Sequence, residues 1–418
     1  MLFQVVLMNM TARRQVRDLR LIWALCIASL VIYINLYMMQ GMLPLIAEHF
    51  QVSSARSTLV LSVTSFTLAL SLLIYAVVSD RIGRHRPIVI SLWVLALSNL
   101  PLVFIDDFRT LLFVRLLQGV LLASLPAIAM AYFKEQLKPQ TMLTAAAVYI
   151  TANSVGGIVG RLLGGAMSQL FDWQSAMLAC FGFSVICVGI AHYLLPKTRD
   201  AVKRERTKLP WSEKLNFSTD IAGFMHHLRD SQMRLAYLIG GITFMMMVNQ
   251  YSFIQLHLMA EPFAWSRFQA TLIFLCYSSG TIASYFTARW IMKHGQLPLF
   301  RLSLLLMFVG SLLTLFDTEF AICIGFLFSS CGFFVTHSCC NSFVAMRATS
   351  HRAKATSLYL CCYYLGAAVG GPYLMMFWHS AGWAGVIGGS MMLLSLIAVF
   401  VWRLGYRQRQ TMLPHPVC

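Results

Sequence analysis

Residues 57–105 read STLVLSVTSFTLALSLLIYAVVSDRIGRHRPIVISLWVLALSNLPLVFI. Two apolar runs, 57–78 and 87–105, stand on either side of one strongly charged turn. Each run has about the 20 residues that an α-helix needs to cross the hydrocarbon core of a bilayer. The stretch therefore predicts two membrane-spanning helices joined by a short polar loop.

The rest of the chain repeats this pattern of apolar runs and short polar breaks. The protein is 58% hydrophobic and only 11% charged, with a mean hydropathy of +0.70, whereas soluble globular proteins are roughly 25% charged. A soluble fold could not bury this much apolar surface, so we expect an all-α membrane protein. Twelve spans are expected near 21–41, 57–78, 87–105, 111–133, 142–166, 174–195, 233–256, 268–288, 299–316, 320–345, 354–377 and 383–402.

Basic residues are concentrated in alternate loops, and this distribution sets the expected orientation. Most of the 32 Lys and Arg residues lie in the two tails, the central hydrophilic segment and the even-numbered loops. Under the positive-inside rule both termini are then cytoplasmic. Topology also accounts for the net charge of +17, which in a soluble protein would suggest nucleic acid. Acidic lipid headgroups are a sufficient partner for these charges, and no nucleic acid is expected.

One long hydrophilic segment divides the chain into two nearly equal parts. It begins at Pro196 and ends near residue 232, and within it Phe217, Ile221 and Phe224 recur at helical spacing. This spacing predicts a short helix on the cytoplasmic membrane surface. The expected organisation is a cytoplasmic tail at 1–20, a six-helix bundle at 21–195, a linker at 196–232, a second six-helix bundle at 233–402 and a cytoplasmic tail at 403–418.

The two parts resemble each other in sequence. A displacement of 210 positions pairs Tyr149 with Tyr359, Gly156 with Gly366, Gly160 with Gly370, and Trp173 with Trp383. A displacement of 214 positions pairs Asn35 with Asn249 and Tyr37 with Tyr251. Internal repeats of this kind enclose a substrate site near the bilayer midplane.

The charged turn in the opening stretch reads SDRIGRHR over residues 79–86. It resembles the G-x-x-x-D-R-x-G-R signature of the major facilitator superfamily, with Ala76 in place of the first glycine. The resemblance implies the major facilitator fold, in which two six-helix bundles surround a central cavity. It also implies a cytoplasmic gate whose charges pair with neighbouring helix ends, formed by Asp80, Arg81, Gly83 and Arg84.

Two further segments resemble motifs of the antiporters in that superfamily. Arg115, Gln118 and Gly119 match R-x-x-Q-G in the fourth span, where an arginine is a functional hypothesis by default. The fifth span resembles the glycine-rich motif of twelve-span drug/proton antiporters through Gly156, Gly160, Arg161 and Gly164. It departs from that motif at Gly157, where a proline is usual. Close helix packing explains the glycines equally well, because small residues four positions apart let helix backbones approach.

Uncharged polar and aromatic residues on the first and seventh spans are the candidates for the substrate cavity: Asn35, Tyr37, Gln40, Asn249, Gln250 and Tyr251. Such groups suit an amphiphilic solute, although hydrogen bonds between helices would explain the same residues. None of the fifteen acidic residues is placed convincingly inside a span. The candidate proton carrier is therefore His337 in the tenth span, or else an acid at the membrane rim. A structural histidine with satisfied hydrogen bonds is the alternative for His337.

These features predict a transporter and argue against an enzyme. The sequence contains no glycine-rich phosphate loop with its lysine and no HExxH or GxSxG motif, so neither ATP nor another cofactor is expected. The eleven cysteines form no CxxC pair, so no metal site is expected.

We expect a secondary active transporter that exports a small amphiphilic or anionic solute in exchange for protons. The antiporter-like motifs favour export, and Arg115 and Arg161 favour an anion over a cation. The alternatives are uptake of a metabolite by proton symport and a membrane sensor of the same fold that does not transport. The resemblance also implies a monomer in a bacterial inner membrane, with protons, a small-molecule substrate and membrane lipids as its partners.

Overall fold

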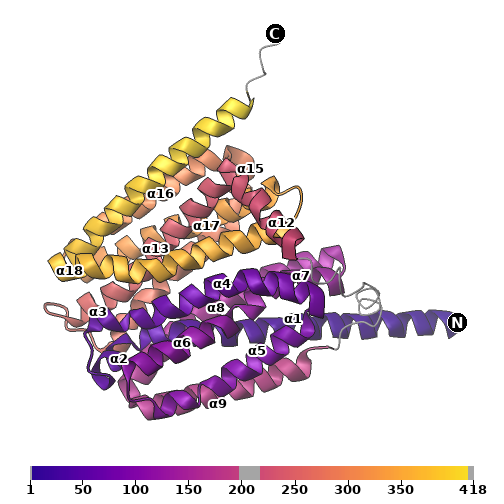
Figure 1. Ribbon diagram of the computed structural model, residues 1–418, viewed down its shortest axis with the longest axis horizontal. Helices are drawn as coiled ribbons and strands as arrows, with labels where there is room; N and C mark the ends of the chain where they lie inside the picture. Colours follow the sequence, from indigo (N-terminus) through magenta and orange to yellow (C-terminus); the bar gives the residue numbers. More distant parts are fainter. Residues whose placement is uncertain (1, 197–216, 413–418) are drawn as a thin grey trace, which may run out of the picture.

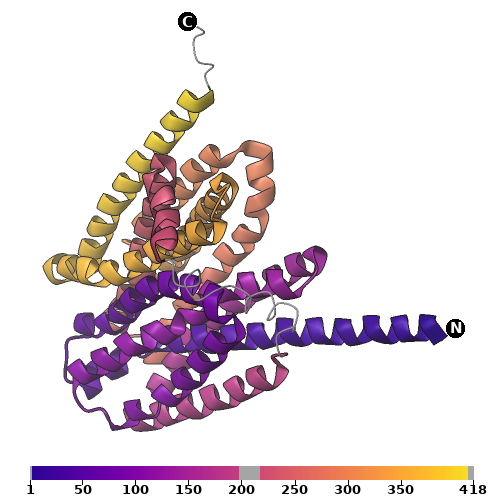
Figure 2. The same cartoon turned by 45° about the vertical axis from the view of Figure 1, so that its right-hand side comes forward.

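The computed structural model describes residues 2–196 and 217–412, which are helical over most of their length and contain no β-strand. The helices form two bundles that lie side by side in Figures 1 and 2. We call helices α1 to α9 the N-half and helices α12 to α18 the C-half. Residues 197–216 of the expected linker and 413–418 of the expected C-terminal tail lie outside the described residues.

The helices of the N-half are α1 (Leu2–Gly41), α2 (Leu43–His49), α3 (Ser54–Ser57), α4 (Leu59–Ile82), α5 (His85–Ser98), η1 (Pro101–Phe104), α6 (Phe108–Leu122), α7 (Ser124–Gln136), α8 (Pro139–Leu170) and α9 (Trp173–Leu194). Those of the C-half are α12 (Phe217–Arg229), α13 (Ser231–Met259), α14 (Arg267–Thr271), η2 (Leu272–Cys276), α15 (Tyr277–His294), α16 (Gln296–Leu313), α17 (Glu319–Arg347) and α18 (Arg352–Met412). The symbol η marks a short 3₁₀ helix.

Nine segments of the described chain are long and apolar enough to cross a membrane. The last of them, 352–408, is two helices, because α18 leaves helical geometry at Ala381 and at Gly382, where φ is +55°. Two further helical segments, α13 and residues 267–294, have the length of a span but carry more polar residues than those nine segments. Within the described ranges the chain therefore supplies twelve spanning helices, six in each half, as the major facilitator fold requires.

Side-chain caps explain where several spans begin. The carboxylate of Asp107 accepts a hydrogen bond from the amide of Thr110 at 2.9 Å, and that of Asp172 accepts one from the amide of Ser175 at 2.8 Å. Each cap satisfies an amide that the first helical turn leaves without a partner. Hydrogen bonds from the side chain and amide of Ser175 hold the pKa of Asp172 below its usual range.

Both halves use the same close packing of two long helices. Helix α8 packs along α1, and α18 packs along α13. A Cβ atom added at Gly160 would lie 2.8 Å from the Cα of Ile34, and one added at Gly366 would overlap the carbonyl oxygen of Gly241. Only glycine permits approaches this close. The glycines of the fifth and eleventh spans therefore serve helix packing.

The predicted pair of tryptophans also occupies matching positions. The indole N–H of Trp173 donates to the carbonyl oxygen of Leu102 at 2.8 Å, and that of Trp383 donates to the carbonyl oxygen of Thr314 at 2.9 Å. Both indoles are buried, so each hydrogen bond satisfies a donor that would otherwise be unpaired. The repeat seen in the sequence is thus a repeat of structure.

The spans end on two opposite faces of the molecule. We call the face that carries the loop at 83–84 and helix α12 the linker end, and the face that carries residues 42–53 and 260–266 the distal end. Gly83 closes the turn at the linker end with φ of +93°, a conformation that favours glycine. Helix α12 packs there on α13 and α18 of the C-half.

Candidate functional site

A buried arginine lies between the two halves. The side chain of Arg161 on α8 is 4% exposed and is surrounded by aromatic rings. Its guanidinium carbon lies 3.7 Å from the ring centre of Tyr37 on α1, and 4.9 Å from the ring centres of Phe274 and Tyr277 in the C-half. We call these four residues the Arg161 cage. Both halves of the protein contribute to it.

The hydrogen bonds recorded for Arg161 go to neutral groups. Its Nε donates to Oε1 of Gln40 and its Nη1 donates to the carbonyl oxygen of Gly157, each at 2.8 Å. Within the described residues no carboxylate is recorded as its partner. An unpaired charge in a bilayer costs roughly 3 kcal/mol, and a desolvated cation–π contact returns about 2 kcal/mol. The rings therefore offset much of the cost without neutralising the charge.

Gln40 connects this arginine to the other half. Its Nε2 donates to the carbonyl oxygen of Val248 and to Oγ of Ser252 on α13, both at 2.8 Å. A second link lies nearer the distal end, where Arg267 donates to the carbonyl oxygen of Ser168 at 3.0 Å and pairs with Glu48. Polar contacts therefore tie the halves together in the distal part of the molecule.

The counterpart of Arg161 in the repeat is a glycine. A displacement of 210 positions pairs Arg161 with Gly371. A Cβ atom added at Gly371 would lie 3.7 Å from the Cβ of Ser62 on α4, and α4 and α18 pack closely across the interface. The two halves therefore meet at close range here, and only the N-half places a cation at the matching position.

Arg115 occupies a second buried polar cluster, inside the N-half. Its side chain is 1% exposed, and its Nη1 donates to Oε1 of Gln118 at 2.6 Å. Its Nε and Nη2 are buried without a hydrogen bond among the described residues. Gln118 in turn donates to Oδ1 of Asn99 at 3.0 Å, and Asn99 donates to Oδ1 of Asn35 at 2.7 Å. Arg115 thus lies among amide and hydroxyl groups with no recorded carboxylate partner.

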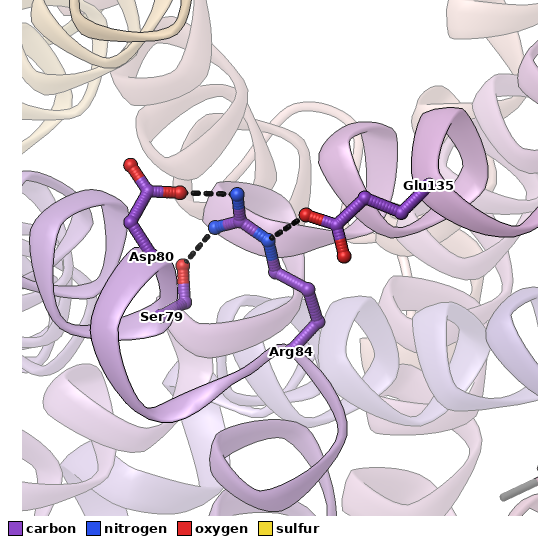
Figure 3. Close-up of polar contacts among 4 residues, drawn as sticks. All are labelled: Ser79, Asp80, Arg84 and Glu135. Carbon is purple, nitrogen blue, oxygen red and sulfur yellow. Dashed lines mark hydrogen bonds and ion pairs between the residues drawn. The ribbon is translucent and has the colours of Figure 1, made fainter. Parts of the chain in front are cut away.

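At the linker end, the charged turn is held mainly by one arginine. Figure 3 shows the guanidinium of Arg84 between Asp80, Ser79 and Glu135. Its Nε donates to Oε1 of Glu135 on α7 at 3.1 Å, and another nitrogen pairs with Asp80. In this conformation Asp80 therefore pairs within its own turn, and the pair of Arg84 with Glu135 fixes that turn to the adjacent helix α7.

The contact from this turn to the C-half runs through Arg81. Arg81 pairs with Asp220 on α12, and Asp220 also pairs with Lys354 at the start of α18 at 3.0 Å. Helix α12 is therefore fastened by one carboxylate to both halves. The side chain of Ile221 on this helix is 60% exposed, which suits a helix at a membrane surface.

A second carboxylate orders the linker end of the C-half. Asp230 accepts hydrogen bonds from the amides of Gln232 and Met233 at the start of α13 and pairs with Arg347 at 2.6 Å. Burial raises the pKa of Asp230, but the hydrogen bonds and the charge of Arg347 outweigh burial and hold that pKa below its usual range.

His337 is bonded to a tyrosine. Its Nδ1 lies 2.8 Å from the hydroxyl oxygen of Tyr359, and its ring centre lies 4.7 Å from that of Tyr363. Within the described residues no acid is recorded as its partner. This environment agrees with the structural alternative for His337 and leaves its role in proton transfer a prediction.

A profile of the Major Facilitator Superfamily matches residues 25–258 and 236–414, which together span most of the chain. The chain belongs to the major facilitator superfamily. This major facilitator protein is thus a membrane transporter and not an enzyme, as the sequence predicts. The motifs at residues 79–86, 115–119 and 156–164 therefore occur in a member of the family that they resemble.

The relatives of this major facilitator protein align with nearly the whole of its chain. The MFS-type transporter YybF of Bacillus subtilis is 31% identical over 379 residues, which span 91% of each chain. The inner membrane transport protein YnfM of Escherichia coli is 31% identical over 383 residues, which span 92% of this chain and 89% of YnfM. The solved nucleoside transporter NupG superposes with a TM-score of 0.73 at 13% identity, over 93% of this chain and 99% of NupG. The superposition shows the shared fold alone.

The candidate cavity residues of this major facilitator protein fall into two groups. Asn35, Asn249 and Gln250 use their amides in hydrogen bonds within their own half, to Ser184, Ala367 and Ser311 respectively. Tyr37 belongs to the Arg161 cage, Gln40 bonds to Arg161, and the ring of Tyr251 stacks on that of Tyr277 at 4.3 Å. Tyr37 and Gln40 of the second group lie at the interface between the halves, whereas the hydroxyl of Tyr251 bonds within the C-half, to Ser330 at 2.7 Å.

Sequence reasoning missed Phe274, Tyr277 and Asp220. Aromatic residues are common in the spans of this major facilitator protein, so nothing in the sequence distinguishes the two rings that face Arg161. The signal available for Asp220 was an acid on a short amphipathic helix otherwise rich in His and Arg.

Proposed function

We propose that this protein exports a small amphiphilic or anionic solute from a bacterial cell in exchange for protons. It would act as a monomer in the inner membrane, with both termini cytoplasmic and its linker end facing the cytoplasm. The two halves would rock about the solute so that each face opens in turn.

One observation carries the proposal: polar bonds through Gln40 and Arg267 join the halves in the distal part of the interface. Such bonds exchange readily for bonds to water, so this contact can open without exposing a large apolar core. In the proposed orientation the distal end faces outward, and the conformation would be closed on that side. Solute would then enter from the cytoplasm once the pair of Arg81 and Asp220 at the linker end has separated, and leave after the distal bonds break.

The charges inside the spans support the proposed solute class. Arg115 and Arg161 are buried cations with no recorded carboxylate partner among the described residues. A cationic solute would meet repulsion from both, whereas an anionic or neutral polar one would not. Aromatic rings beside Arg161 offer apolar surface to the rest of the solute.

Proton coupling is assigned to His337 or to an acid at the rim. Histidine is suited to this role because its charge changes near neutral pH. Uptake of a proton by this group in the outside-facing state, and its release in the inside-facing state, would link each cycle to the pH gradient. The same residues would serve proton symport, so the direction of flux must be measured.

The test is transport by purified protein in proteoliposomes. A thermal-shift screen of amphiphilic anions, neutral solutes and cations would first identify a ligand. Flux of that ligand would then be followed with the pH gradient imposed in either direction, and after a protonophore has collapsed it. Export should be accelerated by an inward proton gradient and lost with the protonophore. Flux that does not depend on the pH gradient would indicate a uniporter, and binding without flux would indicate a sensor.

A further inference from the structure

We propose that the Arg161 cage binds the carboxylate of an organic anion, and that Gln40 is the group that this carboxylate displaces. The inference rests on the proposed function and names the substrate class that the transporter would carry. It concerns a position where this chain departs from the antiporter motif that its fifth span resembles, because the arginine stands among the glycines.

The guanidinium of Arg161 has unused capacity for an anion. It carries five N–H donors in a planar fork, and its hydrogen-bond partners are all neutral: the oxygens of Gln40 and Gly157 and the hydroxyl of Tyr37. A carboxylate that approaches the edge bearing Nε would accept two parallel hydrogen bonds and neutralise the buried charge. An amide oxygen can satisfy one donor there but cannot neutralise the charge.

A second unsatisfied group lies in the same cage. The hydroxyl oxygen of Tyr277 is buried and has no hydrogen bond among the described residues, and the whole residue is 5% exposed. A buried hydroxyl without a partner is unfavourable, and an oxygen of the ligand could accept its proton. The rings of Tyr37 and Phe274 lie against the guanidinium from opposite halves. They supply apolar surface for an aromatic or aliphatic body.

Displacement of Gln40 would connect binding to opening. The same amide that accepts from Arg161 donates to Val248 and Ser252 across the interface. Once a carboxylate takes its place on Arg161, the Gln40 side chain loses the bond that orients it. A link between the halves is then weakened by the ligand itself, which is how a ligand shifts a conformational equilibrium.

The test compares acids with amides of the same shape. Binding of benzoate and 4-phenylbutyrate, and of benzamide and 4-phenylbutanamide, would be measured by calorimetry on purified full-length protein at one pH and without a membrane gradient. We expect each acid to bind wild type about tenfold more tightly than its amide. Arg161→Gln should abolish this preference. Gln40→Ala should tighten binding of the acids by several-fold, because it removes their competitor.

Two further variants separate binding from folding. Tyr277→Phe should weaken binding of the acids more than binding of the amides, because the hydroxyl bonds more strongly to a charged oxygen. Arg109→Gln, which alters an exposed arginine outside the cage and outside the contacts between the halves, should keep the wild-type preference. If Arg161→Gln does not fold, Gln40→Ala and Tyr277→Phe still decide the matter. Equal binding of acid and amide by wild type, no binding of either acid, or weaker acid binding by Gln40→Ala would overturn the proposal. Acid binding without gradient-driven flux would keep the site and overturn the proposed transport cycle instead.

Discussion

Arg115 keeps two nitrogens without a recorded hydrogen bond although its side chain is only 1% exposed. Arginine holds its charge even when it is buried, so the field of this group acts on everything bound nearby. One nitrogen, Nη1, donates to Oε1 of Gln118 at 2.6 Å and to the carbonyl oxygen of Asn35 at 3.4 Å, at the far end of the side chain. At the scale of single residues, the shape of the guanidinium matters as much as its charge.

Arg115→Lys should therefore reduce transport by about tenfold at unchanged protein level, because the shorter lysine side chain does not place its ammonium group where Nη1 lies. Flux in proteoliposomes would measure the effect. Arg109→Lys, at an exposed position on the same helix, is the matched control and should behave as wild type. Normal flux in Arg115→Lys would reduce Arg115 to an anchor near the membrane interface.

His337→Gln tests the proton carrier. Glutamine keeps a polar side chain that can bond to Tyr359 but cannot take up a proton at physiological pH. Accumulation driven by a pH gradient should disappear, whereas counterflow of substrate at equal pH should persist, because exchange requires no net proton movement. His192→Gln, which alters a histidine bonded to Trp93 in the other half, is the control. Loss of both activities would indicate a fault in binding or folding.

The sequence identified the buried arginines because charges are rare and unfavourable in spans. It could not identify their surroundings. Phe274 and Tyr277 lie more than a hundred residues from Arg161 and look like other apolar residues of a span. Only the packing of the two halves brings these rings to Arg161, and that packing is a property of the fold.

The charged turn after α4 shows how much of one structural element the sequence predicts. Its signature predicted a charged contact at the linker end, and the structure places Arg84 between Asp80 and Glu135. Asp80→Asn should remove one of these two ion pairs and depress transport strongly with near-normal expression. Flux per unit of protein would measure the effect. Asp106→Asn, at an exposed position near the distal end, is the control, and unchanged flux in Asp80→Asn would remove the turn from the gate.

Helix α12 provides the second prediction at this scale. Asp220→Asn would remove the ion pairs of Asp220 with Arg81 and with Lys354, two partly buried pairs worth about 1 kcal/mol each. We expect maximal flux to fall several-fold while the affinity for substrate stays unchanged, because α12 lies far along the spans from the Arg161 cage. Initial rates over a range of substrate concentrations would show this. A change in substrate affinity without a change in maximal flux would contradict the role of Asp220 in fastening α12 to both halves.

Helix boundaries were the most predictable part of the elements. Apolar runs placed most span ends within a few residues, because a bilayer fixes the length of a span. They missed the helical extensions at the two ends, since α1 begins at Leu2 and α18 runs to Met412, through residues expected to be tails. The expected short helix in the linker is present as α12. Helix α13 is the exception to simple hydropathy, since it buries Asn249, Gln250 and Gln255 against other helices. The pairing of helices across the halves could not be read from any one element.

For the whole molecule, the close approach of Ser62 and Gly371 allows a direct test of rocking. The distance of 3.7 Å between the Cβ of Ser62 and a Cβ at position 371 falls within the range of a disulfide. In the double variant Ser62→Cys and Gly371→Cys, oxidation should join the halves and stop flux, and a reducing agent should restore it. Each single variant and wild type, treated alike, control for the native cysteines. Full flux in the oxidised, cross-linked protein would exclude separation of the halves at this point.

The difference between Arg161 and Gly371 also has a historical meaning. Duplication of a six-helix unit yields two equal copies, so this difference arose after the duplication. A symmetric dimer of one unit would carry the arginine on both subunits or on neither. Divergence of the two copies therefore made a lone central cation possible, and with it a binding partner whose two ends are chemically unlike.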